Sequence, residues 1–236
     1  MQAIVVKNEP LMEGIYRLTL KGRHGGNAGQ FYMLRCWDSF PLLSRPISIH
    51  DLSEDGITFL YRVHGGGTEL LAKLLPGNSL TLEGPYGNGF PPPQGRTALV
   101  GGGMGIAPLL LAAKEMPEAD VYLGYSGETF SESSFRDLRS SGGLTVISGG
   151  TILDSLEPHR YDTIMTCGPV PMMEELARRC AGSGASLYVS VEKRMACGIG
   201  ACNGCAVETA TGIKKACVDG PVFPAEEVNF HDLALL

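Results

Sequence analysis

The stretch that decides the fold is TALVGGGMGIAPLLLAAKEM, residues Thr97–Met116. Its apolar start, Thr97–Gly102, predicts a buried strand, and the apolar run Ala107–Met116 predicts a helix after a glycine turn. The turn reads Gly103-x-Gly105-x-x-Pro108, so it lacks the last glycine of the G-x-G-x-x-G fingerprint. A strand, a glycine turn and a helix in this order can cradle the phosphates of a dinucleotide. The glycines expected at such a ligand are Gly102, Gly103 and Gly105.

Strands and helices continue to alternate after this stretch. A helix is expected at Pro169–Cys180, where proline at the first position costs no hydrogen bond. Alternation of this kind predicts a doubly wound parallel sheet, whose ligands bind at the carboxyl ends of the strands. The further strands are expected at Val121–Ser126, Leu144–Ser148, Asp162–Gly168 and Ser186–Glu192.

Two of these strand ends carry further candidate ligand contacts. Cys167 and Gly168 close the fourth strand, so they are candidates for nicotinamide contact, although Cys167 fits the role of a small buried hydrophobe nearly as well. Glu128 follows the second strand and can accept ribose hydroxyls. Because no arginine pair stands there to receive a 2′-phosphate, we expect NAD(H) rather than NADP(H).

The residues before this stretch have a different period. They form short β-branched or alternating runs between turns, which predicts a sandwich or a barrel. One helix is expected at Thr68–Leu75, ended by Pro76-Gly77, and the triple proline of Gly87–Gly95 marks a linker. The expected strands are Ala3–Lys7, Ile15–Lys21, Phe31–Cys36, Pro46–Ile49, Ile57–Val63 and Leu80–Gly84.

A possible flavin site lies within this first part. Arg45 opens the motif Arg45-Pro46-Ile47-Ser48, and its guanidinium can bind a pyrophosphate with two hydrogen bonds. Gly67 and Thr68, the latter expected as a helix N-cap, can offer backbone N–H groups to the same anion. A surface salt bridge and an ordinary helix cap are the alternative interpretation of these residues.

Four cysteines near the C-terminus carry the most specific pattern. Their spacing, C-x4-C-x2-C-x11-C, opens as in plant-type [2Fe–2S] ferredoxins, whereas structural zinc sites more often pair two C-x2-C units. Glycines between the first three cysteines allow the backbone to curve around a cluster. The pattern favours an iron–sulfur cluster over zinc or unligated cysteines. The four expected ligands are Cys197, Cys202, Cys205 and Cys217.

Composition limits the remaining possibilities. The 236 residues include 25 acidic and 19 basic side chains, a net charge of −6, with no basic stripe of the kind that nucleic-acid binders carry. We see no signal peptide and no apolar run of the roughly 18 residues that a membrane span needs, and therefore expect a cytoplasmic protein with neither nucleic-acid nor membrane partners. In a reducing compartment, clustered cysteines indicate metal ligands rather than disulfides.

These sites together predict an electron conduit. Nicotinamide exchanges two electrons as hydride, an iron–sulfur centre exchanges one, and a flavin can do both. The sequence offers no acid–base pair or nucleophile that would process a substrate of its own. A zinc-stabilised, non-enzymatic interaction module remains the alternative from a different class.

The phrases LLSRPISI, GMGIAPLL, TCGPVPMM, EKRMACGIGACNGC and ACVDGPVF resemble the ferredoxin–NADP reductase superfamily. More closely, they resemble the electron-transfer subunits of type B dihydroorotate dehydrogenase. The resemblance implies a flavin-binding antiparallel β-barrel domain at 1–94, a parallel-sheet NAD-binding α/β domain at 95–190 and a small [2Fe–2S] domain at 191–236. It adds Leu60, Tyr61 and Arg62 to the FAD site.

The resemblance also implies a partner and a pathway. The partner is an FMN-containing catalytic subunit that oxidises dihydroorotate to orotate in pyrimidine biosynthesis, in a heterotetramer with two copies of each subunit. The expected cofactors are FAD and a [2Fe–2S] cluster, with NAD(H) as substrate. A related subunit that serves a ferredoxin or a hydrogenase is the alternative within the superfamily.

Overall fold

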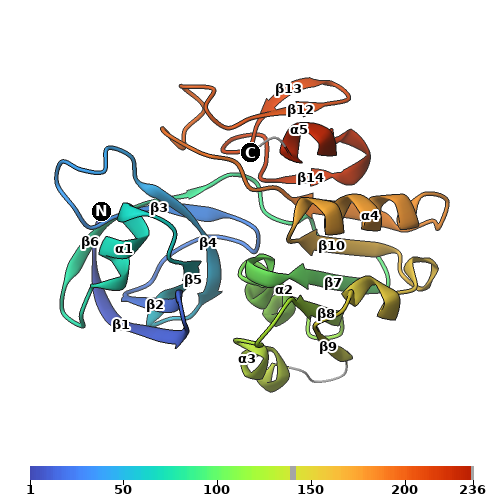
Figure 1. The fold of residues 1–236 in the computed structure, drawn as a ribbon, viewed down its shortest axis with the longest axis horizontal. Helices are drawn as coiled ribbons and strands as arrows, with labels where there is room; N and C mark the ends of the chain where they lie inside the picture. Colours follow the sequence, from blue (N-terminus) through green and yellow to red (C-terminus); the bar gives the residue numbers. More distant parts are fainter. Residues whose placement is uncertain (139–141, 235–236) are drawn as a thin grey trace.

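Six antiparallel strands close into a barrel in the first part of the chain, at the left of Figure 1. The computed structural model describes residues 1–138 and 142–234. The barrel order is β1-β2-β5-β4-β3-β6, and a short helix, α1 (Gly66–Ala72), connects β5 to β6. The barrel strands are β1 (Gln2–Met12), β2 (Ile15–Lys21), β3 (Phe31–Arg35), β4 (Arg45–Leu52), β5 (Gly56–Arg62) and β6 (Ser79–Tyr86).

A six-stranded sheet fills the second part, in the order β14-β11-β10-β7-β8-β9. β7 is buried along its whole length, which explains why its sequence is a continuous apolar run rather than an alternating one. The strands from β7 to β11 run parallel, as predicted. They are β7 (Thr97–Gly102), β8 (Asp120–Tyr125), β9 (Leu144–Ser148), β10 (Thr163–Cys167) and β11 (Ser186–Ser190). The helices between them are α2 (Leu109–Glu115), α3 (Glu132–Asp137) and α4 (Val170–Cys180).

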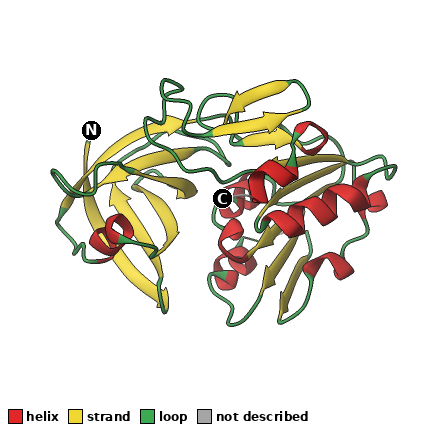
Figure 2. Cartoon of the chain, turned by 45° about the horizontal axis from the view of Figure 1, so that its top comes forward, coloured by secondary structure: helices red, strands yellow, loops and turns green. Residues whose placement is uncertain are grey.

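The C-terminal part joins both other parts. A hairpin of β12 (Ala206–Thr209) and β13 (Gly212–Lys215) lies above the junction of barrel and sheet in Figures 1 and 2. The chain then returns as β14 (Val222–Pro224), which pairs antiparallel with β11, and ends in α5 (Phe230–Ala234). The sequence predicts no strand after β11, because a strand of three residues is too short to show a period.

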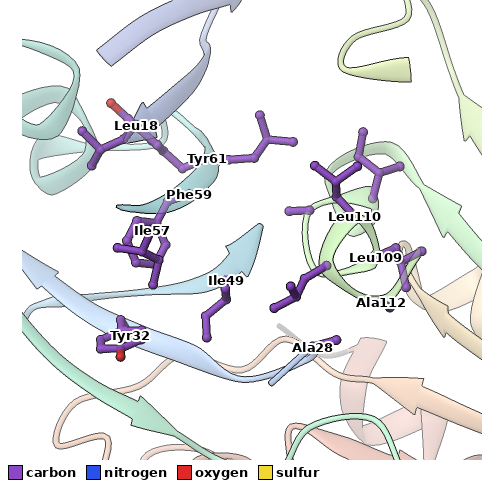
Figure 3. Close-up of a cluster of buried hydrophobic side chains, with 14 of the residues drawn as sticks. Leu18, Ala28, Tyr32, Ile49, Ile57, Phe59, Tyr61, Leu109, Leu110 and Ala112 are labelled. Carbon is purple, nitrogen blue, oxygen red and sulfur yellow. The ribbon is translucent and has the colours of Figure 1, made fainter. Parts of the chain in front are cut away.

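One of the two hydrophobic clusters in the described residues runs from the barrel into α2 and the sheet. Ile49 of β4 lies between the barrel side chains and Leu109 of α2, as Figure 3 shows, and each of these two side chains is 0% exposed. Polar contacts reinforce the junction: the Nδ1–H of buried His50 donates to the Ala107 carbonyl at 2.8 Å, and Lys114 pairs with Asp51 at 2.8 Å. The barrel therefore fixes the start of α2, and with it the glycine turn after β7.

The predicted fold class, a β-barrel followed by a parallel α/β domain and a small C-terminal part, is confirmed. Local boundaries differ. A 3₁₀ turn at Gly103–Ile106 precedes α2, so the α-helix begins at Leu109 rather than at Ala107, and α1 begins at Gly66 rather than at Thr68. No helix in the described ranges 1–138 and 142–234 is long and apolar enough to cross a membrane.

His50 gives the junction a testable pH dependence. Burial lowers the pKa of His50 from 6.5 to about 4. Below pH 6.5 the unfolded chain therefore binds a proton that the folded chain excludes, so stability that is complete above pH 6.5 is lost as the pH falls towards 4. Between pH 7 and pH 5 we expect His50 to account for a loss of about 2 kcal/mol in the free energy of unfolding.

Urea denaturation at both pH values, on the wild type and on His50→Gln, measures this contribution. The glutamine amide can still donate to Ala107 but does not titrate, so the variant should lose about 2 kcal/mol less than the wild type over this range. His159→Gln, at an exposed position, is the control and should follow the wild type. Equal losses in wild type and His50→Gln would contradict the assignment.

Candidate functional site

The β12–β13 hairpin brings two of the four predicted sulfur ligands together. Ala206 pairs with Lys215 in the hairpin register, so Cys205 and Cys217, just outside these residues, flank the open end of the ladder. The Ala216 N–H donates to the Cys205 carbonyl at 3.0 Å. The side chains of Cys205 and Cys217 interact directly, and both residues are buried at 2% exposure.

The other two ligands lie on the preceding loop. The side chains of Cys197 and Cys202 interact directly, and the charge on Cys197 also acts on Cys217. The loop curves because Gly198 and Gly200 have φ of +71° and +79°, a region that side-chain-bearing residues rarely adopt. The four sulfurs therefore form two neighbouring pairs at one place in the structure.

Backbone N–H groups point at these sulfurs. The Gly200 N–H donates to Cys217 Sγ at 3.2 Å and the Gly204 N–H donates to Cys202 Sγ at 3.4 Å. The N–H groups of Ile199, foremost, and of Cys202 and Ala201 act on Cys197 Sγ; with the Cys202 side chain they lower the pKa of Cys197 to about 6. Burial, foremost, and the neighbouring Cys205 raise the pKa of Cys217 to about 11.

This arrangement fits a [2Fe–2S] cluster. Such a cluster takes two thiolates on each of its two irons and gains from N–H groups directed at the sulfurs. A structural zinc ion needs its four donors around a single point. The paired sulfurs thus favour the cluster over the zinc alternative.

Arg45 and the start of α1 meet at the predicted flavin site. The guanidinium lies so close to the Gly67 backbone that a Cβ at Gly67 would be 2.5 Å from Arg45 Nε. It is held there by a hydrogen bond from Arg45 Nη1 to the Leu43 carbonyl, 2.6 Å, and by the Trp37 ring, 5.5 Å from Cζ. Glycine at position 67 is therefore needed for this close approach.

Thr68 differs from its prediction as a helix N-cap. The N-cap is Gly65, at φ +83°, and Thr68 is the third residue of α1. Its hydroxyl accepts the His64 N–H at 2.7 Å and donates to the Gly65 carbonyl at 2.9 Å. Thr68 therefore stabilises the glycine turn from inside the helix. Gly65 occupies the cap because glycine readily adopts the positive φ of this position.

The other predicted flavin residues lie on β4 and β5. Pro46, Ile47 and Ser48 are half-buried along β4. On β5, Leu60 and Tyr61 are barrel-core residues with 2% and 1% exposure, and the Tyr61 hydroxyl donates to Asn8 at 3.2 Å. Arg62, at the end of β5, is exposed.

The predicted dinucleotide residues also converge. A Cβ at Gly105 would be 2.1 Å from the Cys167 carbonyl oxygen, and one at Gly168 would be 3.0 Å from the Gly102 nitrogen. The loop after β7 thus lies directly against the loop after β10. Cys167 is 3% exposed, and burial raises the pKa of its thiol, as expected of a packed residue.

A cleft of about 360 Å³ separates the barrel from this edge of the sheet. It is lined by Gly103 and Glu128 on the sheet side and by Arg62 and Glu13 on the barrel side. Sequence reasoning missed Glu13, since the β1–β2 turn that carries it has no motif. It also missed Glu192, after β11, where burial raises the carboxyl pKa and Arg62 opposes that effect.

Comparison with known proteins supports this arrangement. Residues 192–229 match the model of the iron–sulfur cluster binding domain of dihydroorotate dehydrogenase B. The chain is 40% identical over 237 residues to the electron transfer subunit of dihydroorotate dehydrogenase B (NAD(+)) from Clostridium acetobutylicum, covering 97% of this chain and 96% of that one. It is 38% identical to the subunit of the same name from Caldanaerobacter subterraneus, with 98% of each chain covered.

Solved structures extend the likeness to the whole fold. A structure described as NADH-dependent reduced ferredoxin-NADP oxidoreductase superposes with a TM-score of 0.87 at 26% identity, covering 99% of this chain and 91% of that one. The ferredoxin reductase of carbazole 1,9a-dioxygenase, at 19% identity and a TM-score of 0.66 over 80% of this chain and 68% of that one, shares the fold alone.

These matches confirm the predicted electron-transfer function and, with it, the cofactor set of FAD, a [2Fe–2S] cluster and NAD(H). A dihydroorotate dehydrogenase B electron transfer subunit works with a catalytic subunit. The prediction that this chain has a catalytic partner subunit is therefore confirmed as well. The chain belongs to the family of electron transfer subunits of dihydroorotate dehydrogenase B.

Proposed function

We propose that this chain connects NAD(H) to an FMN-containing catalytic subunit that oxidises dihydroorotate to orotate, in the cytoplasmic synthesis of pyrimidines. The observation that carries the proposal is the convergence of three sites on the barrel. The cysteine loop rests on it, because a Cβ at Gly198 would be 3.1 Å from Met33 of β3 and 3.5 Å from Tyr86 of β6. The dinucleotide cleft is lined by Arg62, at the end of β5.

The barrel would hold FAD through Arg45. The guanidinium is already fixed by the Leu43 carbonyl and stands against the Gly67 backbone, so an anion placed there would meet a charged donor that needs no rearrangement. Thr68 keeps the glycine turn in shape beneath it. The residues proposed for FAD are Arg45, Pro46, Ile47, Ser48, Leu60, Tyr61, Arg62, Gly67 and Thr68.

The sheet edge would hold NAD(H). Gly102 and Gly105 let the loop after β7 pack against Pro169 and Cys167, and Gly103, which has open space beside its backbone, would face the pyrophosphate. Cys167 and Gly168 support that loop from β10. Glu128 can accept the ribose hydroxyls. Glu128 and Glu13 outnumber Arg62 along the cleft, so its lining would repel the 2′-phosphate of NADP(H).

When bound, FAD supplies the exchange between the two-electron chemistry of nicotinamide and the one-electron chemistry of an iron–sulfur cluster. The chain's own residues bind and orient these groups. Cys197, Cys202, Cys205 and Cys217 would hold the cluster, and the N–H groups around them would stabilise negative charge on their sulfurs.

The catalytic partner would cover the cysteine loop. Cys202 is exposed, and two apolar residues of the same region, Ile199 in the cysteine loop and Val218 after Cys217, are 61% and 48% exposed. Exposed apolar side chains at the proposed cluster site are typical of a surface that a protein partner covers. We propose an assembly of two copies of each subunit, with flavin, NAD and cluster functions assigned to residues 1–94, 95–190 and 191–236.

Arg45→Ala should weaken FAD binding roughly ten- to hundredfold, because a charge-assisted hydrogen bond is worth about 1.5–3 kcal/mol. Titration of the deflavinated protein with FAD, followed by flavin fluorescence, measures the change. Gly67→Ala should have the same direction of effect, since the added methyl displaces the guanidinium. Arg23→Ala, at an exposed barrel residue, is the matched control. Unchanged affinity in Arg45→Ala would show that Arg45 is only structural.

Cys202→Ser should remove or weaken the cluster, because a hydroxyl is a poor ligand for iron. NADH should still reduce FAD, since both bind to other segments, whereas reduction of the FMN-containing subunit should collapse. Stopped-flow reduction by NADH and a coupled assay with the catalytic subunit measure the two steps. Cys180→Ser, in α4, is the control.

Two outcomes of the Cys202→Ser experiment would contradict the proposal. Wild-type reduction of the partner without a cluster would place the cluster off the path. Loss of FAD reduction together with the cluster would show that the four cysteines chiefly hold the fold together.

A further inference from the structure

Lys215 is fixed beside the cysteine loop. It is the last residue of β13, two positions before Cys217, and its Nζ donates to the Gly200 carbonyl at 2.6 Å. Its backbone is held as well: its N–H donates to Asp219 Oδ2 at 2.7 Å, and its carbonyl accepts the Asp219 N–H at 2.8 Å. The ammonium group therefore has a defined position on the loop.

The residue that Lys215 binds reaches a sulfur. The Gly200 carbonyl accepts from the Lys215 ammonium, and the Gly200 N–H donates to Cys217 Sγ at 3.2 Å. Lys215 therefore holds the residue whose N–H is directed at Cys217. A positive charge at this position stabilises negative charge on the sulfur through the low-dielectric loop.

The neighbouring lysine serves as an internal comparison. Lys214 Nζ forms an ion pair with Glu227 at 2.6 Å, so its charge is neutralised on the other side of the hairpin. Among the described residues Lys215 forms no ion pair, so its charge remains available to the loop.

We propose that Lys215 is a positioning residue that holds Gly200, whose N–H donates to Cys217 Sγ, and thereby raises the reduction potential of the cluster. The inference rests on the proposed binding of a [2Fe–2S] cluster by the four cysteines. One-electron reduction of such a cluster adds one negative charge to a group that four thiolates already make anionic. N–H groups directed at the sulfurs and a nearby ammonium stabilise that added charge, and both favour the reduced form.

A redox titration tests the proposal. The cluster is reduced with dithionite in the presence of mediator dyes, and its reduced fraction is followed by electron paramagnetic resonance. In Lys215→Gln, whose amide can donate to Gly200 but carries no charge, the ratio of reduced to oxidised cluster at a fixed potential should fall roughly three- to tenfold. A tenfold fall corresponds to about 59 mV for one electron.

Two matched variants separate position from charge. Lys215→Arg keeps a charged donor and should stay near the wild-type potential. Lys214→Gln removes one positive charge from the adjacent position and should also leave the potential unchanged. Equal shifts in Lys214→Gln and Lys215→Gln, or no shift in Lys215→Gln at full iron content, would overturn the proposal.

The outcomes remain distinguishable if a variant assembles poorly. If Lys215→Gln binds too little iron for a titration, the potential of Lys215→Arg tests the proposal instead. A clearly lowered potential in iron-loaded Lys215→Arg would contradict the role of charge. A wild-type protein without iron–sulfur absorption would instead refute the proposed cluster, independently of Lys215.

Discussion

The C-terminal part of this structure is organised around backbone N–H groups that are directed at three of the four cysteine sulfurs, those of Cys197, Cys202 and Cys217. The Cys197–Cys205 loop can meet this constraint only with left-handed glycines, since the turns at Gly198 and Gly200 would strain other residues. A loop of this kind has little stability of its own. It is held from outside by the β12–β13 hairpin, by Lys215 at the Gly200 carbonyl and by the barrel under Gly198.

The same requirement explains why the C-terminal part is joined so closely to the rest of the chain. Asn88, just after the barrel, donates to the carbonyls of Val218 and Asp219 at 3.1 and 3.0 Å. β14 then completes the sheet beside β11. Electron transfer needs fixed distances between the cofactors, and these contacts keep the cysteine loop, the barrel and the sheet edge in one arrangement.

Much of this arrangement could be predicted from sequence, because its signals are local. The cysteine spacing, the glycine turn after β7 and the two segments that contain Arg45 and Gly67 are short motifs whose chemistry restricts the choice of residue. The close approach of Gly67 to Arg45, 2.5 Å from a Cβ to Nε, shows why that glycine belongs to the motif.

What could not be predicted depends on contacts distant in sequence. β14 has only three residues and forms because β11 offers a free edge. Glu13 reaches the cleft because the barrel closes, and Lys215 reaches Gly200 because the hairpin folds back. Thr68 lies in the first turn of α1 because Gly65 is the N-cap, and the sequence alone does not decide between these two residues as the cap.

Metal and sulfide analysis of the anaerobically purified protein, combined with Mössbauer spectroscopy, measures whether the four sulfurs bind a cluster in two pairs. We expect about two irons and two acid-labile sulfides per chain, with each iron bound by two cysteine thiolates. One zinc ion per chain without sulfide would contradict this pairing, because a single ion would require all four sulfurs around one point.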